Sequence, residues 1–283
     1  STRKALMIAV INLLIVLLPL MYGLAAVNYL VWFVRREPFA ARFSTPWMLI
    51  AVGLHATFTG LRALHFDRQP IGNIAESLSV VAFALAAVYL YVEQVQRTRT
   101  TGTFILPLVF CLQLASSALL PTAEVTLPEH PLLRSTIFGV HALLAVVGHS
   151  AFALGFVYGV MHVMLYRALK SGQFGLVFER LPSLDVLSAM VFRSTFIGWL
   201  ALTGTIVVGV VMSVDHFPEF YLDPKFLTTI LVWTVYGATV LAYLGLKWQG
   251  TRSVYGSLAG FIVAMVAWAG SSFIWKSFHS FLS

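Results

Sequence analysis

The sequence predicts an all-α membrane protein, a polytopic bundle of about eight transmembrane helices, and three observations lead to this prediction. First, 59% of the 283 residues are hydrophobic and only 10% are charged, whereas a typical soluble domain carries about 25% charged residues. Second, the mean hydropathy is +0.87. Third, long apolar stretches alternate with short charged segments. A soluble enzyme is therefore excluded, and the 22 Phe, 10 Tyr and 7 Trp also exclude an intrinsically disordered chain.

A transmembrane helix is predicted wherever about 20 mainly apolar residues follow one another, because that length crosses the hydrocarbon core. The first stretch is too long for a signal peptide and has no small-residue cleavage site, so we interpret it as the first span. All spans are assigned to one transmembrane domain, residues 1–283. The predicted spans are residues 5–34, 46–64, 73–92, 104–121, 136–166, 194–214, 226–246 and 255–275.

The charged residues of the loops predict the orientation. With eight spans, one side of the membrane holds eleven of the 18 basic residues and four of the 11 acidic ones. The positive-inside rule places that side in the cytoplasm and both termini on the outer, periplasmic side. We therefore expect a multi-pass protein of a bacterial inner membrane. The net charge of +7 then reflects the excess of basic residues in the loops on one side of the lipid bilayer, and no nucleic-acid partner is expected.

Two segments carry signals for the start of a helix. Leu181-Pro182-Ser183-Leu184-Asp185 lies in the longest loop, residues 168–193, and places Pro and Ser ahead of an acidic first turn. Asp223-Pro224-Lys225 begins the seventh span with Pro at a permitted first-turn position. We expect a helix to begin at each of these two motifs.

Several of the eight histidines are predicted to lie within the bilayer, where ionisable groups are costly and suggest function. His55 lies near the middle of the second span, and His65 lies about 15 Å further along at its outer end. The fifth span runs the opposite way, so His141 lies near the outer face and His149 near mid-membrane. The two helices thus offer histidines at two matching depths, and each pair can face one interior.

Haem is the cofactor that these histidines favour. A neutral imidazole in an apolar pocket is a common axial ligand of haem, and two of them form a b-type site. Zn or Cu would also accept histidine, but a structural Zn site usually needs four ligands that include Cys or carboxylate. Cys111 is the only cysteine and no C-x-x-C-H motif is present, so the haem would be non-covalent. The alternative is that each histidine hydrogen-bonds to a neighbouring helix.

Three charged residues near the outer ends of the second and third spans are further candidates. Glu76 opens the third span, where it could contact a haem propionate partner or a proton, or could simply complement the helix dipole. Arg62 and Arg68 could bind propionates, or could extend to the membrane interface. Three further histidines are placed at the outer rim: His130, His216 and His279.

Short motifs follow one another along most of the chain, from about residue 50 to the end. They are Pro70…Asn73…Glu76-Ser77-Leu78, Gly102…Pro107, His141 with Phe152, Leu181-Pro182…Leu184-Asp185, Gly198…Leu202-Thr203…Gly209, Asp223-Pro224-Lys225, Trp233, Tyr236 and His279. In this order they resemble the CcsA/HemX-like cytochrome c assembly family. The resemblance implies a polytopic membrane protein that binds or moves haem.

The resemblance also implies roles for particular residues. His141 and His279 correspond to the family's outer-face haem-ligand pair, and His55 resembles a membrane histidine of some branches. His149 lies where such spans often carry Tyr, so it would be an additional ligand. Haem-presenting members have a Trp-rich segment before Asp-Pro-Lys, but residues 215–223 contain no Trp. This departure favours the HemX-like branch, or a relative recruited as a haem-bearing subunit.

We therefore expect a haem b-binding membrane protein that handles haem in cytochrome c biogenesis or its regulation. The first haem is assigned to His141 and His279, with His65 or His216 as substitutes. A second haem between His55 and His149 is the bolder hypothesis. Two alternatives stay open: a permanent electron-transfer subunit of a larger membrane redox complex, and a structural subunit without cofactor. No hydrolytic or transferase motif is found, and the expected partners are other membrane or periplasmic cytochrome-related proteins.

Overall fold

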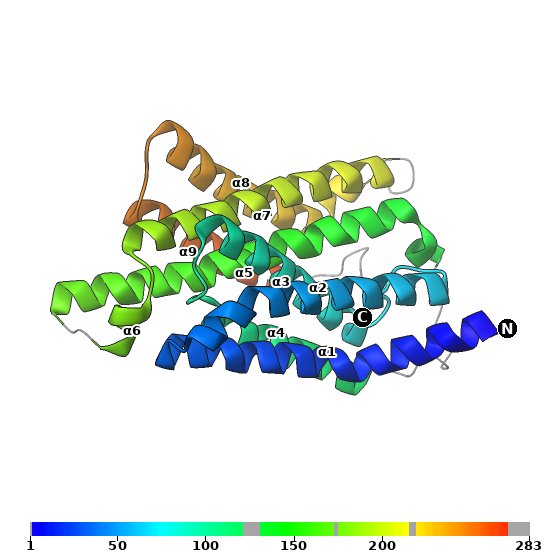
Figure 1. Cartoon of the computed structure of the whole chain (residues 1–283). Coiled ribbons are helices and arrows are strands. Elements are labelled where there is room, and N and C mark those ends of the chain that lie inside the picture. The colour runs from blue at the N-terminus through cyan, green and yellow to red at the C-terminus, as the bar shows by residue number, and fades with distance from the viewer. Residues whose placement is uncertain (1, 121–130, 173–174, 215–218, 271–283) are drawn as a thin grey trace. The chain divides into compact units, whose positions relative to one another are not determined.

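The described part of the chain is built from helices (Figure 1). A computed structural model describes residues 2–120, 131–172, 175–214 and 219–270, and these ranges contain no strand. The all-α prediction is therefore confirmed. The elements are α1 (Thr2–Arg35), α2 (Pro38–Phe66), α3 (Ile74–Gln96), α4 (Gly102–Leu119), η1 (Pro131–Arg134), α5 (Thr136–Ser171), α6 (Leu176–Arg180), α7 (Leu184–Ser213), η2 (Phe220–Leu222), α8 (Pro224–Gly245) and α9 (Thr251–Ala269).

Seven helices within the described ranges are long and apolar enough to cross a membrane: α1, α2, α3, α4, α5, α7 and α8. They coincide with the first seven predicted spans, which confirms a multi-pass helical membrane protein. The eighth predicted span begins within α9, a shorter apolar helix, and its residues 271–275 lie outside the described residues. The eighth span therefore stays a prediction.

The largest difference from the predicted boundaries is at the start of α7. The prediction of a helix start at Leu184 is confirmed, because the Ser183 side chain accepts a hydrogen bond from the Val186 amide and caps the helix. The predicted span begins only at residue 194, after Arg193. However, α7 runs through Arg193 without a break, because one exposed arginine on a helix surface does not end the helix.

The predicted start of the seventh span is also confirmed. The Asp223 side chain accepts hydrogen bonds from the amides of Lys225 and Phe226, at 2.8 and 3.3 Å. Pro224 occupies the first turn, where its missing N–H leaves no partner unsatisfied. In the same way, Asn73 caps α3 by accepting a hydrogen bond from the Glu76 amide at 2.8 Å.

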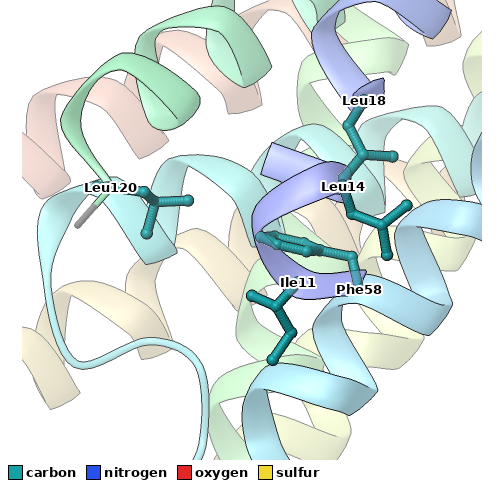
Figure 2. Close-up of a cluster of buried hydrophobic side chains, with 6 residues drawn as sticks. Ile11, Leu14, Leu18, Phe58 and Leu120 are labelled. Carbon is teal, nitrogen blue, oxygen red and sulfur yellow. The ribbon is translucent and has the colours of Figure 1, made fainter. Parts of the chain in front are cut away.

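The chain divides into two compact units, residues 1–139 and 140–283, and each is described by itself. In the first unit, α1 packs against α2 and α4, and α3 packs against the same two helices. Figure 2 shows one of its apolar clusters, in which side chains of α1 and Phe58 of α2 are buried with Leu120. The prediction of one transmembrane domain stays a prediction.

In the second unit, α7, α8 and α9 pack against one another. The core contains Phe152 and Tyr236, whose rings stack with their centroids 3.7 Å apart. Gly198 permits a close approach of α5 and α7, because a methyl group there would lie 2.5 Å from the Phe152 ring and 3.0 Å from the Gly148 carbonyl oxygen. The α5–α7 pair positions the histidine described next.

Candidate functional site

His141 on α5 is held in an orientation that leaves one ring nitrogen available. Its Nδ1 lies 3.0 Å from the backbone oxygen of Thr205 on α7. A carbonyl oxygen can only accept, so Nδ1 carries the proton and the lone pair is on Nε2. Among the described residues, Nε2 has no hydrogen-bond partner. Ligating histidines are commonly oriented by such a second bond, so the arrangement fits an axial ligand of haem iron.

Gly209 on α7 provides the space for this ring. A methyl group at residue 209 would lie 2.9 Å from Cε1 and 3.1 Å from Nδ1 of His141. Any side chain at residue 209 would therefore require the His141 ring to shift. The sequence motif Gly198…Gly209 contains this residue, but nothing in the motif indicates which side chain faces it.

Replacing Gly209 with alanine is expected to push the His141 ring away from Thr205. An added methyl group in a packed helix interface typically costs about 1–3 kcal/mol of folding free energy. Thermal unfolding in detergent, followed by circular dichroism, measures the loss. Gly53→Ala is the matched control, because no atom lies within 4 Å of the methyl group it would add on α2. Equal melting temperatures for the two variants would contradict the packing argument.

His149 lies on the same helix and is exposed on the surface of the second unit. Its Nδ1 donates to the Ala145 oxygen of the preceding turn at 2.8 Å, and its ring meets the Phe152 ring edge-on at 6.3 Å between centroids. Like His141, it has no partner for Nε2 among the described residues. His149 therefore remains a candidate ligand, with its orientation set by its own helix.

His55 belongs to the first unit and has both ring nitrogens occupied. Ser79 Oγ donates its only hydrogen to Gln113 Oε1 at 3.0 Å, so it must accept from His55 Nε2 at 2.9 Å. His55 Nδ1 then carries the lone pair, which accepts from the Tyr22 hydroxyl at 3.0 Å. The four side chains come from α1, α2, α3 and α4, and together they form one buried chain of hydrogen bonds.

In this geometry neither ring nitrogen of His55 has a free lone pair, so iron could bind only if Tyr22 moved away, and His55 as a haem ligand stays a prediction. For His55 the alternative of hydrogen bonds to neighbouring helices describes what is found. The pairing of His55 with His149 stays a prediction, since the two residues belong to different units. Ser79 and Gln113 are polar residues within predicted apolar spans, and that position is the sequence signal by which they could be identified as hydrogen-bond partners.

Three predicted site residues come together in one buried ion-pair cluster. Glu76 Oε1 lies 2.8 Å from Arg62 Nη2, and Glu76 Oε2 lies 2.9 Å from Arg68 Nη1. The Gly72 amide also donates to Oε2 at 2.9 Å. Glu76 is therefore the counter-ion of two arginines as well as a first-turn acid of α3. A contact of any of the three with propionate stays a prediction.

The other predicted ligands are less closely defined. His65, near the end of α2, is half-buried, and its ring packs edge-on against Phe66 with the centroids 4.7 Å apart. His130, His216 and His279 lie outside the described residues. The proposed pair of His141 and His279 therefore stays a prediction.

Glu93 forms a second buried polar cluster that the sequence did not indicate. Its Oε2 accepts from the hydroxyls of Tyr29 at 2.7 Å and Tyr89 at 2.5 Å, and its Oε1 accepts from Thr45 at 2.6 Å. Arg99 Nε donates to Thr45 Oγ1 at 3.0 Å. The predicted span ends at residue 92, which places Glu93 in the following loop as one of the four acidic residues on the predicted cytoplasmic side. In fact α3 continues to Gln96 and keeps Glu93 buried.

His162 on α5 was also not singled out. It is buried, with Nδ1 3.2 Å from the Leu184 oxygen and Nε2 3.3 Å from the Thr251 hydroxyl. Both ring nitrogens are therefore used to connect α5 to the first residues of α7 and α9. For this histidine, too, the hydrogen-bonding alternative describes what is found.

The fold and these groups define a multi-pass helical membrane protein whose spans contain oriented histidines and buried carboxylates. A family model described as "Cytochrome C assembly protein" matches residues 71–279. The chain belongs to this cytochrome c assembly protein family.

Individual relatives agree with this membership. The cytochrome c biogenesis protein CcsA of Heterosigma akashiwo is 25% identical over 253 residues, which cover 78% of this chain and 79% of the relative. The CcsA protein of Synechococcus sp. (strain CC9902) is 26% identical over 235 residues, covering 75% and 77%. That of Guillardia theta is 23% identical over 239 residues, covering 78% and 79%. The resemblance inferred from the order of the motifs is confirmed.

Proposed function

We propose that the protein binds haem b without a covalent bond and handles it in cytochrome c biogenesis or its regulation. The observation that carries this proposal is the presentation of His141 Nε2, with Nδ1 tied to the Thr205 carbonyl. Membership of the cytochrome c assembly family and relatives named for cytochrome c biogenesis support it. A bound haem supplies the iron that accepts an imidazole nitrogen.

The residues around His141 have defined tasks in this proposal. Thr205 fixes the tautomer and the rotation of the ring, and Gly209 leaves room for it. His279 is the proposed second ligand, on the family resemblance alone. We place the protein in a bacterial inner membrane with both termini outside, so that His141 lies near the outer face. Membrane or periplasmic cytochrome-related proteins are the proposed partners.

Replacement of His141 tests the proposal. Purified protein reconstituted with haem is expected to show a Soret band typical of histidine ligation. His141→Ala is expected to weaken haem binding by more than the roughly 10- to 100-fold that a change beyond the ligands costs. His162→Gln is the matched control on the same helix, because both nitrogens of His162 are already hydrogen-bonded.

Two results would contradict the proposal: no Soret band in the wild-type protein, or undiminished haem binding in His141→Ala. Pyridine-haemochrome quantitation of the same samples gives the number of haems per chain. One haem per chain, unchanged when His55 and His149 are replaced, would reject the second haem. A permanent two-haem electron-transfer subunit would then be rejected with it.

A further inference from the structure

Arg62 on α2 is a buried side chain whose hydrogen-bonding capacity is largely unused. It is one of the largest fully buried side chains in the described ranges and is 1% exposed. Only Nη2 is paired, with Glu76 Oε1 at 2.8 Å. Nε and Nη1 are buried and have no hydrogen-bond partner among the described residues. Leaving a buried donor unpaired is unfavourable, so these two N–H groups require an explanation.

The charges around Arg62 are also unbalanced. Arg68 donates to both carboxylate oxygens of Glu76, and Arg62 donates to one of the same oxygens. The single negative charge of Glu76 is therefore shared by two guanidinium groups, and the cluster carries one excess positive charge. A buried charge without compensation is strongly unfavourable. The cluster is thus electrostatically suited to one more anion.

Two aromatic rings lie close to the Arg62 guanidinium but do not provide hydrogen-bond acceptors for its donors. The Phe66 and Phe58 rings lie 4.9 and 5.8 Å from Cζ, measured to the ring centroids. A cation–π contact attracts the guanidinium charge to the face of an aromatic ring, but it supplies no oxygen or nitrogen acceptor for the N–H groups. The edge that carries Nε and Nη1 is therefore the side from which an acceptor would bind.

The position of Arg62 along α2 indicates what kind of molecule could bring that acceptor. Arg62 lies four residues before the last residue of α2, about 6 Å along the helix axis. It is therefore near the end of a membrane span, at the depth where an amphipathic molecule keeps its charged group next to its apolar body. A small soluble anion has no such body to place there.

We propose that Arg62 is an oxyanion-binding residue, whose Nε and Nη1 donate two hydrogen bonds to a carboxylate or phosphate carried by an amphipathic molecule. The planar fork of arginine matches two oxygens of one such group. Arg68 holds Glu76 and thereby positions Arg62 without binding the anion itself. This site lies within the first unit and needs neither haem iron nor His141, so it goes beyond the proposed function.

The test compares each acid with an uncharged partner, using the full chain purified in a non-ionic detergent. Protoporphyrin IX, which contains no iron, is compared with its dimethyl ester by quenching of tryptophan fluorescence. Dioleoyl phosphatidic acid is compared with dioleoylglycerol by native mass spectrometry. The wild-type protein is expected to prefer at least one acid by about tenfold or more. The preferred acid identifies the source of the oxyanion as a porphyrin carboxylate or a lipid phosphate.

Variants assign that preference to Arg62. Arg62→Met is expected to reduce it to less than about threefold, while Arg42→Gln, an exposed arginine of the same helix, retains it. Arg62→Lys keeps the positive charge but loses the planar guanidinium with its paired donors. If Arg62→Met does not fold, the preference for the acid is measured in Arg62→Lys instead, and the same reduction is expected. No preference in the wild type, or the full preference in a folded Arg62 variant, overturns the proposal. His141→Ala should leave the preference unchanged, which separates this test from that of haem ligation.

Discussion

Replacing Glu76 with alanine is expected to lower the free energy of unfolding by about 3–5 kcal/mol. The side chains of Arg62 and Arg68 are 1% and 4% exposed, and Glu76 provides the negative charge that both of them contact. Without it, two positive charges are buried near each other with no counter-ion between them. Glu76 also accepts from the Gly72 amide, so the loop before α3 loses a contact as well.

Unfolding by sodium dodecyl sulphate, followed by circular dichroism, measures this loss. Glu37→Ala is the matched control, because Glu37 is exposed and its side chain makes no capping hydrogen bond. Its effect should remain within about 0.5 kcal/mol. The double variant Glu76→Ala/Arg62→Met should be more stable than Glu76→Ala alone, because one of the uncompensated charges is gone. Equal stability of Glu76→Ala and Glu37→Ala would show that the ion pairs contribute nothing.

Replacing Gly102 with alanine is expected to have the second largest effect, about 3 kcal/mol. A methyl group at residue 102 would overlap the ring of Tyr29 and the hydroxyl oxygen of Tyr89, and both residues are fully buried. These tyrosines cannot move without weakening their hydroxyl bonds to Glu93. The variant therefore overpacks the start of α4. It also weakens the hydrogen bonds that the buried Glu93 carboxylate accepts from the two tyrosines.

The same unfolding measurement tests Gly102→Ala. Gly60→Ala is its matched control in the first unit, because no atom lies within 4 Å of the methyl group that it would add. Alanine also has the higher helix propensity, so Gly60→Ala should be neutral or slightly stabilising. If Gly102→Ala behaved like Gly60→Ala, the tyrosines would have to be freer to shift than their burial indicates.

The helices were predictable because their main signal is local. Apolar stretches of membrane-spanning length located the seven long helices of the described ranges, and the cap residues Ser183 and Asp223 located two of their starts. The boundaries failed where a charged residue stood inside a helix, as Arg193 does in α7 and Glu93 does in α3. A hydropathy pattern treats such residues as loop, whereas partners from other helices or an exposed position allow them to stay helical.

The contacts of the candidate site were not predictable, because they join segments distant in the sequence. His141 was recognised from its depth, but its partner Thr205 is 64 residues away and contributes only a backbone oxygen. His55 was recognised in the same way, yet its two partners, Tyr22 and Ser79, lie on two other helices and occupy both of its ring nitrogens. Which helices are neighbours cannot be read from one sequence, so the role of each histidine could not be distinguished.

The hydrogen-bond chain from Tyr22 through His55 and Ser79 to Gln113 also affects how the four helices of the first unit can slide. Much of the surface of these helices is apolar, and apolar packing alone would allow several vertical registers of similar energy. Moving any one helix by one residue, about 1.5 Å along its axis and about 100° around it, would break at least one link and leave a buried polar group unpaired. This series of hydrogen bonds therefore favours one vertical alignment of α1, α2, α3 and α4 over the others.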